Sequence, residues 1–240
     1  MSSPRDDVVV TTGWMAQGTR LLLGEIDALD DDALAGPSRL PDWTNAQLVA
    51  HVARNADALM RLISWARTGV ETPMYVSPGA RAAEIDRDAA RPAEVLRADV
   101  HDSAGALAAA IAACTGKDWR RQVRSARGRA MPAADVPWMR VREVWLHAVD
   151  LGGGSATMAD LPGDLVVTML DDVAGMYAQR GDAPAVLLTD DDAHSWSFGS
   201  GADVADVTGS AADLLGWLTG RSDGSTLQPP GGLPNLPAWL

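Results

Sequence analysis

Cysteine is almost absent from the sequence: Cys114 stands alone, so no disulfide can form within the chain. Structural disulfides belong to oxidising compartments, and their absence favours a cytoplasmic location. The sequence also has no run of about 18 apolar residues, the length that a membrane-spanning helix needs. Residues 1–10 carry acids where a secretory signal would carry basic and then apolar residues. We therefore expect a cytoplasmic protein that is neither secreted nor inserted in a membrane.

Positive charge is scarce as well. The chain has 20 Lys and Arg against 32 Asp and Glu, which gives a formal net charge of −12 at pH 7. A surface of this charge repels the phosphates of nucleic acids and the headgroups of anionic lipids over long range. We therefore expect neither a nucleic acid nor a membrane as a partner.

Apolar residues recur at helical spacing in four segments of the first two thirds of the chain, and each segment predicts a helix. Thr44 and Gln47 form a capping-box pattern at the start of the second segment, and Gly69 suits its C-terminal end. Residues 71–81 hold two prolines and a glycine, which predicts an ordered loop. Residues 119–131 predict a short hairpin or an irregular excursion. The predicted helices span residues 9–29, 44–68, 92–114 and 135–151.

The pattern changes after three consecutive glycines, residues 152–154, which are the best candidate for a linker. Beyond them the sequence predicts two helices, residues 162–179 and 210–220, on either side of three short strands. We therefore predict an α+β protein with two domains: residues 1–153 form a helical bundle, and residues 154–240 form a smaller α/β domain. The predicted strands span residues 185–189, 194–198 and 203–207.

Glu143 and His147 lie four residues apart on the last predicted helix of the bundle, so their side chains project from adjacent turns. Such a pair is half of a metal site. His51 lies at the edge of the apolar face of the helix predicted at residues 44–68, and it would face the pair if the two helices are antiparallel. A set of two histidines and one glutamate leaves an open coordination position, as catalytic zinc sites do.

The same residues also allow a purely structural interpretation. Chance alone would place about one acid four residues from a histidine in this sequence. His51 could lie at the edge of the core, and Glu143 and His147 could belong to a solvated face together with Arg140 and Asp150. The tryptophans of that helix lie on its opposite side, which suits this interpretation. The residue pattern alone leaves both interpretations open.

Two segments closely resemble the mycothiol-dependent maleylpyruvate isomerase family: residues 68–78, TGVETPMYVSP, followed by Arg81, and residues 138–152, WMRVREVWLHAVDLG. Residues 42–44 and 50–53 are similar to the second-helix motif of this family and of the wider DinB-like bundles. The resemblance implies an N-terminal DinB-like four-helix bundle. It also implies a smaller C-terminal α/β domain with a sterol-carrier-like fold.

The resemblance further implies that His51, Glu143 and His147 bind zinc, with water or the sulfur of mycothiol completing the ligands. It implies an enzyme of aromatic catabolism that isomerises maleylpyruvate to fumarylpyruvate in gentisate degradation. A thiolate would add to the cis double bond and leave after rotation. Cys114 is a poor candidate for that thiolate, because no histidine or metal ligand is spaced near it in its Ala-rich helix. The thiol would therefore come from mycothiol, and a metal ion would lower its pKa and stabilise the developing enolate.

The substrate of this family carries two carboxylates, which arginine can bind through two parallel hydrogen bonds. The resemblance points to Arg81 and Arg221 for this role. The alternatives are that Arg81 is a solvated loop residue and that Arg221 caps the negative end of a helix. Five further arginines are interpreted as a solvated basic excursion and not as a site: Arg120, Arg121, Arg124, Arg127 and Arg129.

Two other functions stay open at this stage. A mycothiol S-transferase would use the same metal and thiol on another electrophile, and it would consume the thiol. A non-catalytic binding or regulatory module would show neither turnover nor a bound metal. The presence of all three ligand types and the match around Arg81 favour the isomerase.

Overall fold

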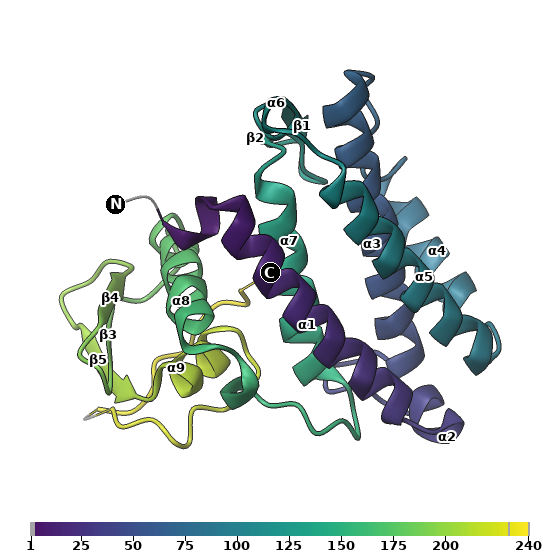
Figure 1. Cartoon of the computed structure of the whole chain (residues 1–240). Coiled ribbons are helices and arrows are strands. Elements are labelled where there is room, and N and C mark those ends of the chain that lie inside the picture. The colour runs from purple at the N-terminus through teal and green to yellow at the C-terminus, as the bar shows by residue number, and fades with distance from the viewer. Residues whose placement is uncertain (1–2, 230, 240) are drawn as a thin grey trace. The chain divides into compact units, whose positions relative to one another are not determined.

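The computed structural model describes residues 3–229 and 231–239, and it divides into two compact units. The first unit ends at Ala156 and the second begins at Thr157 (Figure 1). No helix among the described residues is both long enough and apolar enough to cross a membrane.

The first unit is a bundle of four long helices: α1 (Val8–Ala28), α3 (Asn45–Thr68), α5 (Ala93–Ala112) and α7 (Asp135–Asp150). Helix α1 packs on α7, α7 on α3, α3 on α5, and α5 on α1, so that each helix contacts two others around a common core. The predicted four-helix bundle is thus confirmed. Its short additional elements are the helices α2 (Asp31–Ala35) and α6 (Gly116–Trp119) and the 3-10 helix η1 (Pro4–Asp6).

Helix α3 begins and ends where the sequence predicts. The Thr44 side chain accepts a hydrogen bond from the Gln47 N–H at 3.1 Å, and the Gln47 side chain accepts one from the Thr44 N–H at 3.0 Å. These two bonds satisfy backbone donors that the first turn of a helix cannot pair. At the other end Gly69 adopts a φ of 78° and donates to Trp65, as helix C-caps commonly do.

The core of the bundle surrounds α3. Leu48, Leu59 and Leu62 of this helix are completely buried. Burial of each such side chain stabilises the fold by about 1.5–3 kcal/mol. Because α3 is buried on most of its faces, its polar residues His51 and Asn55 are enclosed, at 5% and 4% exposed.

One sequence-based expectation was wrong. Residues 71–81 were expected to form a loop, but helix α4 (Pro78–Ala89) begins inside that segment. Ser77 caps the helix by accepting from the Ala80 N–H at 3.1 Å, and a proline is favourable in a first helical turn. The helix carries few apolar residues, with Ile85 buried, so apolar periodicity gives it no signal.

The hairpin expected within residues 119–131 is present. Strand β1 (Gln122–Arg124) pairs antiparallel with β2 (Ala130–Pro132), and Val123 lies opposite Met131. Both of these side chains are buried, and they anchor the hairpin to the bundle. The hairpin leads directly into α7.

The second unit is a small α/β domain, as predicted. Helix α8 (Gly163–Ala178) and helix α9 (Ala211–Leu218) accompany a three-stranded sheet with the order β4-β3-β5. Tyr177 of α8 stacks on Phe198 at 5.0 Å between ring centroids and donates a hydrogen bond to the Leu218 carbonyl. The last strand lies two residues later than expected. The remaining elements are β3 (Val186–Asp190), β4 (Ser195–Phe198), β5 (Ala205–Gly209) and the 3-10 helix η2 (Met158–Asp160).

The glycines expected to form the linker are attached to the first unit. Gly152 exchanges two hydrogen bonds of 2.8 Å with the side chain of Asn45, and Arg39 donates to the Gly154 carbonyl. A Cβ atom at Gly152 would lie 2.0 Å from the Pro37 carbonyl oxygen, so only glycine fits there. The division into two units follows just after this segment, between Ala156 and Thr157.

A cluster of ion pairs joins three helices of the bundle. Arg54 of α3 contacts Asp57 of the same helix, Asp88 of α4 and Asp99 of α5. Burial alone would raise the pKa of Asp88, but hydrogen bonds from Arg87 and Arg54 outweigh burial and lower that pKa. The ionised form of Asp88 therefore stabilises the contact between α4 and α3.

We predict that Asp88→Asn lowers the free energy of unfolding at pH 7 by about 1–3 kcal/mol, because Arg54 loses a charged acceptor. The folded-state pKa of Asp88 is lowered, so its contribution is present above the unfolded-state value of about 3.9 and is lost as the pH falls through the folded-state pKa. Urea unfolding of both proteins between pH 3 and pH 7 measures this difference. Asp102→Asn, at an exposed position on α5, is the matched control. An equal deficit at both ends of the pH range would contradict the prediction.

Candidate metal centre

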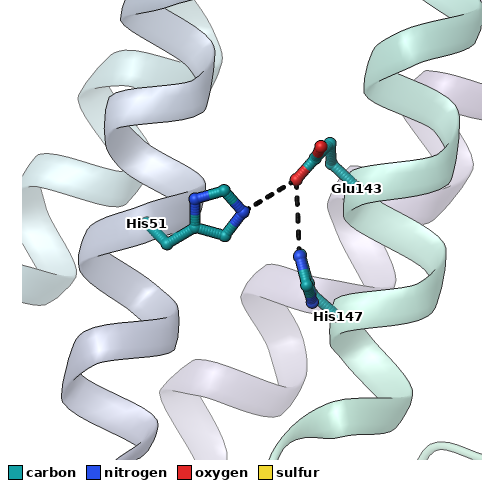
Figure 2. A group of neighbouring side chains, drawn as sticks. All are labelled: His51, Glu143 and His147. Carbon is teal, nitrogen blue, oxygen red and sulfur yellow. Dashed lines mark hydrogen bonds and ion pairs between the residues drawn. The ribbon is translucent and has the colours of Figure 1, made fainter. Parts of the chain in front are cut away.

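The structure brings His51, Glu143 and His147 together (Figure 2). His51 Nε2 lies 2.9 Å from Glu143 Oε2, and His147 Nε2 lies 3.4 Å from the same oxygen. One potential ligand atom from each residue lies within 4.8 Å of those of the other two. His51 projects from α3, and the other two project from adjacent turns of α7, so the predicted convergence of the two helices occurs.

The face of α7 that carries these residues is largely covered: the side chain of Glu143 is 28% exposed and that of His147 is 14% exposed. Arg140 and Asp150, on the same side, are each 1% exposed, and His51 is 5% exposed. The opposite side of α7 is also covered, because Trp145 donates a hydrogen bond to the Trp14 carbonyl of α1 at 2.9 Å. The interpretation of this face as solvated is therefore wrong, and the physical reason is that the polar side of α7 packs on α3.

Glu143 supplies the negative charge of the centre. Burial alone would raise the pKa of Glu143, but hydrogen bonds from His147 and His51 hold it well below its usual value, so the carboxylate is ionised. Burial lowers the pKa of His51, and its contacts with Glu143 offset this only in part. The pKa of His147 is raised because hydrogen bonds to Asp150 and Glu143 outweigh its burial. The centre thus holds one negative charge between two imidazoles.

Hydrogen bonds orient both imidazoles. His147 Nδ1 lies 2.8 Å from the buried carboxylate of Asp150, and His51 Nδ1 lies 3.1 Å from Arg81 Nη2. In both rings Nδ1 is held from outside and Nε2 is directed toward Glu143. The Asp150 carboxylate can accept from His147 Nδ1–H while Nε2 binds an ion, as outer partners of metal-binding histidines do, whereas Arg81 can only donate to His51 Nδ1.

A buried cation lies beside the centre. The Arg140 side chain donates 2.8 Å hydrogen bonds to the Val52 carbonyl and to the Asn55 side chain, both on α3. Burial lowers the pKa of Arg140 to about 10, so its guanidinium stays charged at neutral pH. The positive charge favours ionised Glu143 on the same helix.

A cavity of about 640 Å³ lies against the centre, a volume that suits a small molecule. His51 and Glu143 form part of its wall. Tyr75, also in the wall, lies 5.8 Å from the guanidinium of Arg81, and burial raises the pKa of its hydroxyl. The other lining residues come from α3, the segment before α4, the first turn of α4, the β1–β2 hairpin and α7: Asn55, Trp65, Glu71, Pro73, Met74, Val76, Ser77, Arg81, Arg124, Ser125, Ala126, Arg127, Gly128 and Met139.

The donor set and its surroundings fit a divalent metal ion. Two histidines and one ionised glutamate supply three ligands, and the cavity leaves room for a further ligand. A second group of possible ligands, Asp190, Asp192 and His194, occurs at the β3–β4 turn. There Asp190 accepts hydrogen bonds from the backbone N–H groups of the other two, which explains the cluster as turn structure.

Comparisons with protein-family models match the two units to two domains of the same family. The model of the mycothiol maleylpyruvate isomerase N-terminal domain matches residues 15–152, and the model of the MDMPI C-terminal domain matches residues 160–238. The chain belongs to the mycothiol maleylpyruvate isomerase family.

Among solved structures, two of this isomerase family are similar to the chain over its full length. One is a crystal structure of the mycothiol-dependent maleylpyruvate isomerase, and the other is a variant of that enzyme with one histidine replaced by alanine. Each is 33% identical, covers 100% of both chains and has a TM-score of 0.94. A search of curated proteins found no match. The resemblance seen in the sequence is confirmed.

In this member of the maleylpyruvate isomerase family, the two predicted substrate arginines have different surroundings. Arg81 lies in the first turn of α4, contacts His51 and lines the cavity, so it is not a solvated loop residue. Arg221 follows α9 in the second unit, donates to the Thr219 carbonyl at 2.9 Å, and lies 5.9 Å from the ring of Trp239. Its contact with a carbonyl at the helix end agrees with a capping role.

The sequence analysis did not assign Asp150 and Arg140 to the site. Asp150 follows His147 by three residues on a helix, and that spacing could have indicated a partner for the imidazole. Arg140 gives no such signal, because its acceptors are on α3. Cys114 behaves as expected, since burial raises the pKa of its thiol.

We predict that Asp150→Asn weakens the binding of a divalent metal ion about 10- to 100-fold, because the His147 ring loses the anion that orients it. Competition with a chelator measures the dissociation constant, and circular dichroism checks the fold. The exposed Asp102→Asn variant again serves as a control for the loss of one negative charge. An unchanged dissociation constant in Asp150→Asn would remove this residue from the site.

Proposed function

We propose that this chain isomerises maleylpyruvate to fumarylpyruvate, with mycothiol and a zinc ion bound by His51, Glu143 and His147. The observation that carries the proposal is the convergence of these three residues beside a cavity of about 640 Å³. Full-length similarity to a mycothiol-dependent maleylpyruvate isomerase supports the same reaction. The single cysteine favours the cytoplasm as the location, and the charge of −12 argues against nucleic acid as a partner.

The reaction needs a nucleophile that can add and leave. When bound, mycothiol would supply a thiolate that adds to the conjugated cis double bond and departs after rotation, so no thiol is consumed. Cys114 is unsuited to that role, because its pKa is raised and its Sγ contacts the Ala110 carbonyl of its own helix. A metal ion at the centre would favour the thiolate and stabilise the negative charge that develops on the enol oxygen.

The protein itself holds and orients the reactants. Glu143 stays ionised between the two imidazoles, so the three ligands are directed toward one point before any ion arrives. Arg81 places a guanidinium in the wall of the cavity, beside His51. We propose that it binds a substrate carboxylate. We propose the same role for Arg221, on the basis of the family resemblance.

We predict that the protein converts maleylpyruvate only when both a divalent metal and mycothiol are present, and that mycothiol is fully recovered. Absorbance of the substrate gives the rate, and a thiol assay gives the balance. Net consumption of mycothiol with formation of an adduct would instead identify an S-transferase. No bound metal and no turnover would indicate a binding module.

The metal ligands supply the control for this assay. Glu143→Ala and His147→Ala should each lower zinc content and activity together, because either change leaves two protein ligands. His101→Ala should change neither, since His101 pairs with Asp27 outside the site. Full zinc content in both ligand variants would exclude the assignment of the site.

We predict that Arg81→Gln and Arg221→Ala each keep the zinc content but lower kcat/KM for maleylpyruvate by about tenfold or more, because a charged hydrogen bond to a carboxylate is lost. Metal analysis and steady-state kinetics at saturating mycothiol measure the two quantities. Arg20→Gln, at an exposed position on α1, controls for the loss of one positive charge. Wild-type kinetics in either variant would remove that arginine from the site.

A further inference from the structure

The turn of the β1–β2 hairpin forms part of the cavity wall. Arg124, at the end of β1, and Arg127, in the turn, line the same cavity as His51 and Glu143. The sequence alone suggested that the arginines of this segment are a solvated excursion. They are exposed, but the fold brings two of them to the cavity.

The hairpin holds these arginines on a fixed scaffold. The Gly128 N–H donates to the Ser125 carbonyl at 2.8 Å, and the Ser125 N–H donates to the Arg129 carbonyl at 3.0 Å. Gly128 adopts a φ of 78°, which glycine permits at little cost. Strand β1 packs on α3 and strand β2 packs on α7, the two helices that carry the metal ligands. The turn is therefore positioned by the elements that build the centre.

Neither arginine has an ion-pair partner among the side chains that the structure describes. Within the part of the chain that the structure describes, the Arg124 guanidinium forms one hydrogen bond, to the Gly128 carbonyl at 3.5 Å. Other arginines of the bundle, such as Arg54 and Arg97, are instead paired with aspartates. Glu71 and Glu143 also line the cavity, but among the described residues neither forms an ion pair with these two arginines. Two cations placed in this way attract an anionic ligand and raise its local concentration.

We propose that Arg124 and Arg127 together bind one carboxylate of the dicarboxylate substrate and so select doubly charged substrates. The inference rests on the proposed function, and it adds a specificity element that lies outside the metal centre. Arg81 lines the same cavity next to His51, so the other carboxylate is left to the two arginines proposed above, Arg81 and Arg221. Two separate cationic sites in one cavity match a substrate with an acid group at each end.

The test compares the wild-type protein with Arg124→Gln/Arg127→Gln. Arg129→Gln is the matched control, because Arg129 belongs to the same turn, is exposed, and does not line the cavity. Three quantities are measured: KM for maleylpyruvate at saturating mycothiol, KM for mycothiol, and the dissociation constant of maleylpyruvate without thiol by calorimetry. The double variant should raise the first and the third at least about fivefold and leave the second within about twofold. Added salt should raise KM for maleylpyruvate more in the wild type than in the double variant.

Several outcomes would overturn the inference. These are unchanged maleylpyruvate binding in the double variant, an equal loss in Arg129→Gln, or an effect confined to KM for mycothiol. If the wild type binds maleylpyruvate without turnover, the proposed function fails, and a weaker dissociation constant in the double variant still supports the two arginines. If the wild type does not bind maleylpyruvate at all, both the function and the inference fail.

Discussion

The antiparallel contact between α3 and α7 is the constraint on which the site depends. His51 and Glu143 are 92 residues apart in the sequence, and only this contact brings them within 2.9 Å. Hydrogen bonds join the two segments on both sides of the metal ligands. Asn45 exchanges hydrogen bonds with Gly152 at one end, and Arg140 donates to the Asn55 side chain at the other. A shift of one helix along the other by one residue, about 1.5 Å, would disturb these bonds and the three-residue centre together.

This arrangement also explains how charges are tolerated inside a helical bundle. An isolated buried carboxylate is costly, but the carboxylate of Glu143 accepts from two imidazoles and lies near the Arg140 guanidinium. Removal of one of these groups would leave the remaining polar groups between α3 and α7 without their hydrogen-bond or charge partner. We therefore infer that the charges of Glu143, the two imidazoles and Arg140 depend on one another, so that a change in one of these groups affects the others.

Much of the fold could be predicted from the sequence, because the long helices carry their own caps and apolar periods. Thr44, Gln47 and Gly69 define α3 without any tertiary information. The metal ligands could be proposed from residue type and spacing, although the resemblance to a family was needed to choose them over a solvated face. Helix α4 was missed, because alanines and charged residues form a helix there without an apolar stripe.

The positions of Arg140, Asp150, Arg124 and Arg127 could not be predicted for a different reason. A helical wheel shows which residues share a face, but it does not show what covers that face. The polar side of α7 is buried because α3 presents matching polar groups. The hairpin arginines reach the cavity because β1 and β2 pack on the same two helices, which is a property of the tertiary structure.

The hydrogen bond between Arg81 and His51 has a consequence for metal binding. A guanidinium can only donate, so His51 Nδ1 accepts from it, and the ring proton of the neutral imidazole must then be on Nε2, facing Glu143. An ion coordinated by Nε2 requires the other tautomer, with the proton on Nδ1, and that proton leaves Arg81 no lone pair to donate to. Metal loading and this contact therefore exclude each other. Occupation of the centre would detach the guanidinium from the ring and make it available to an incoming acid group.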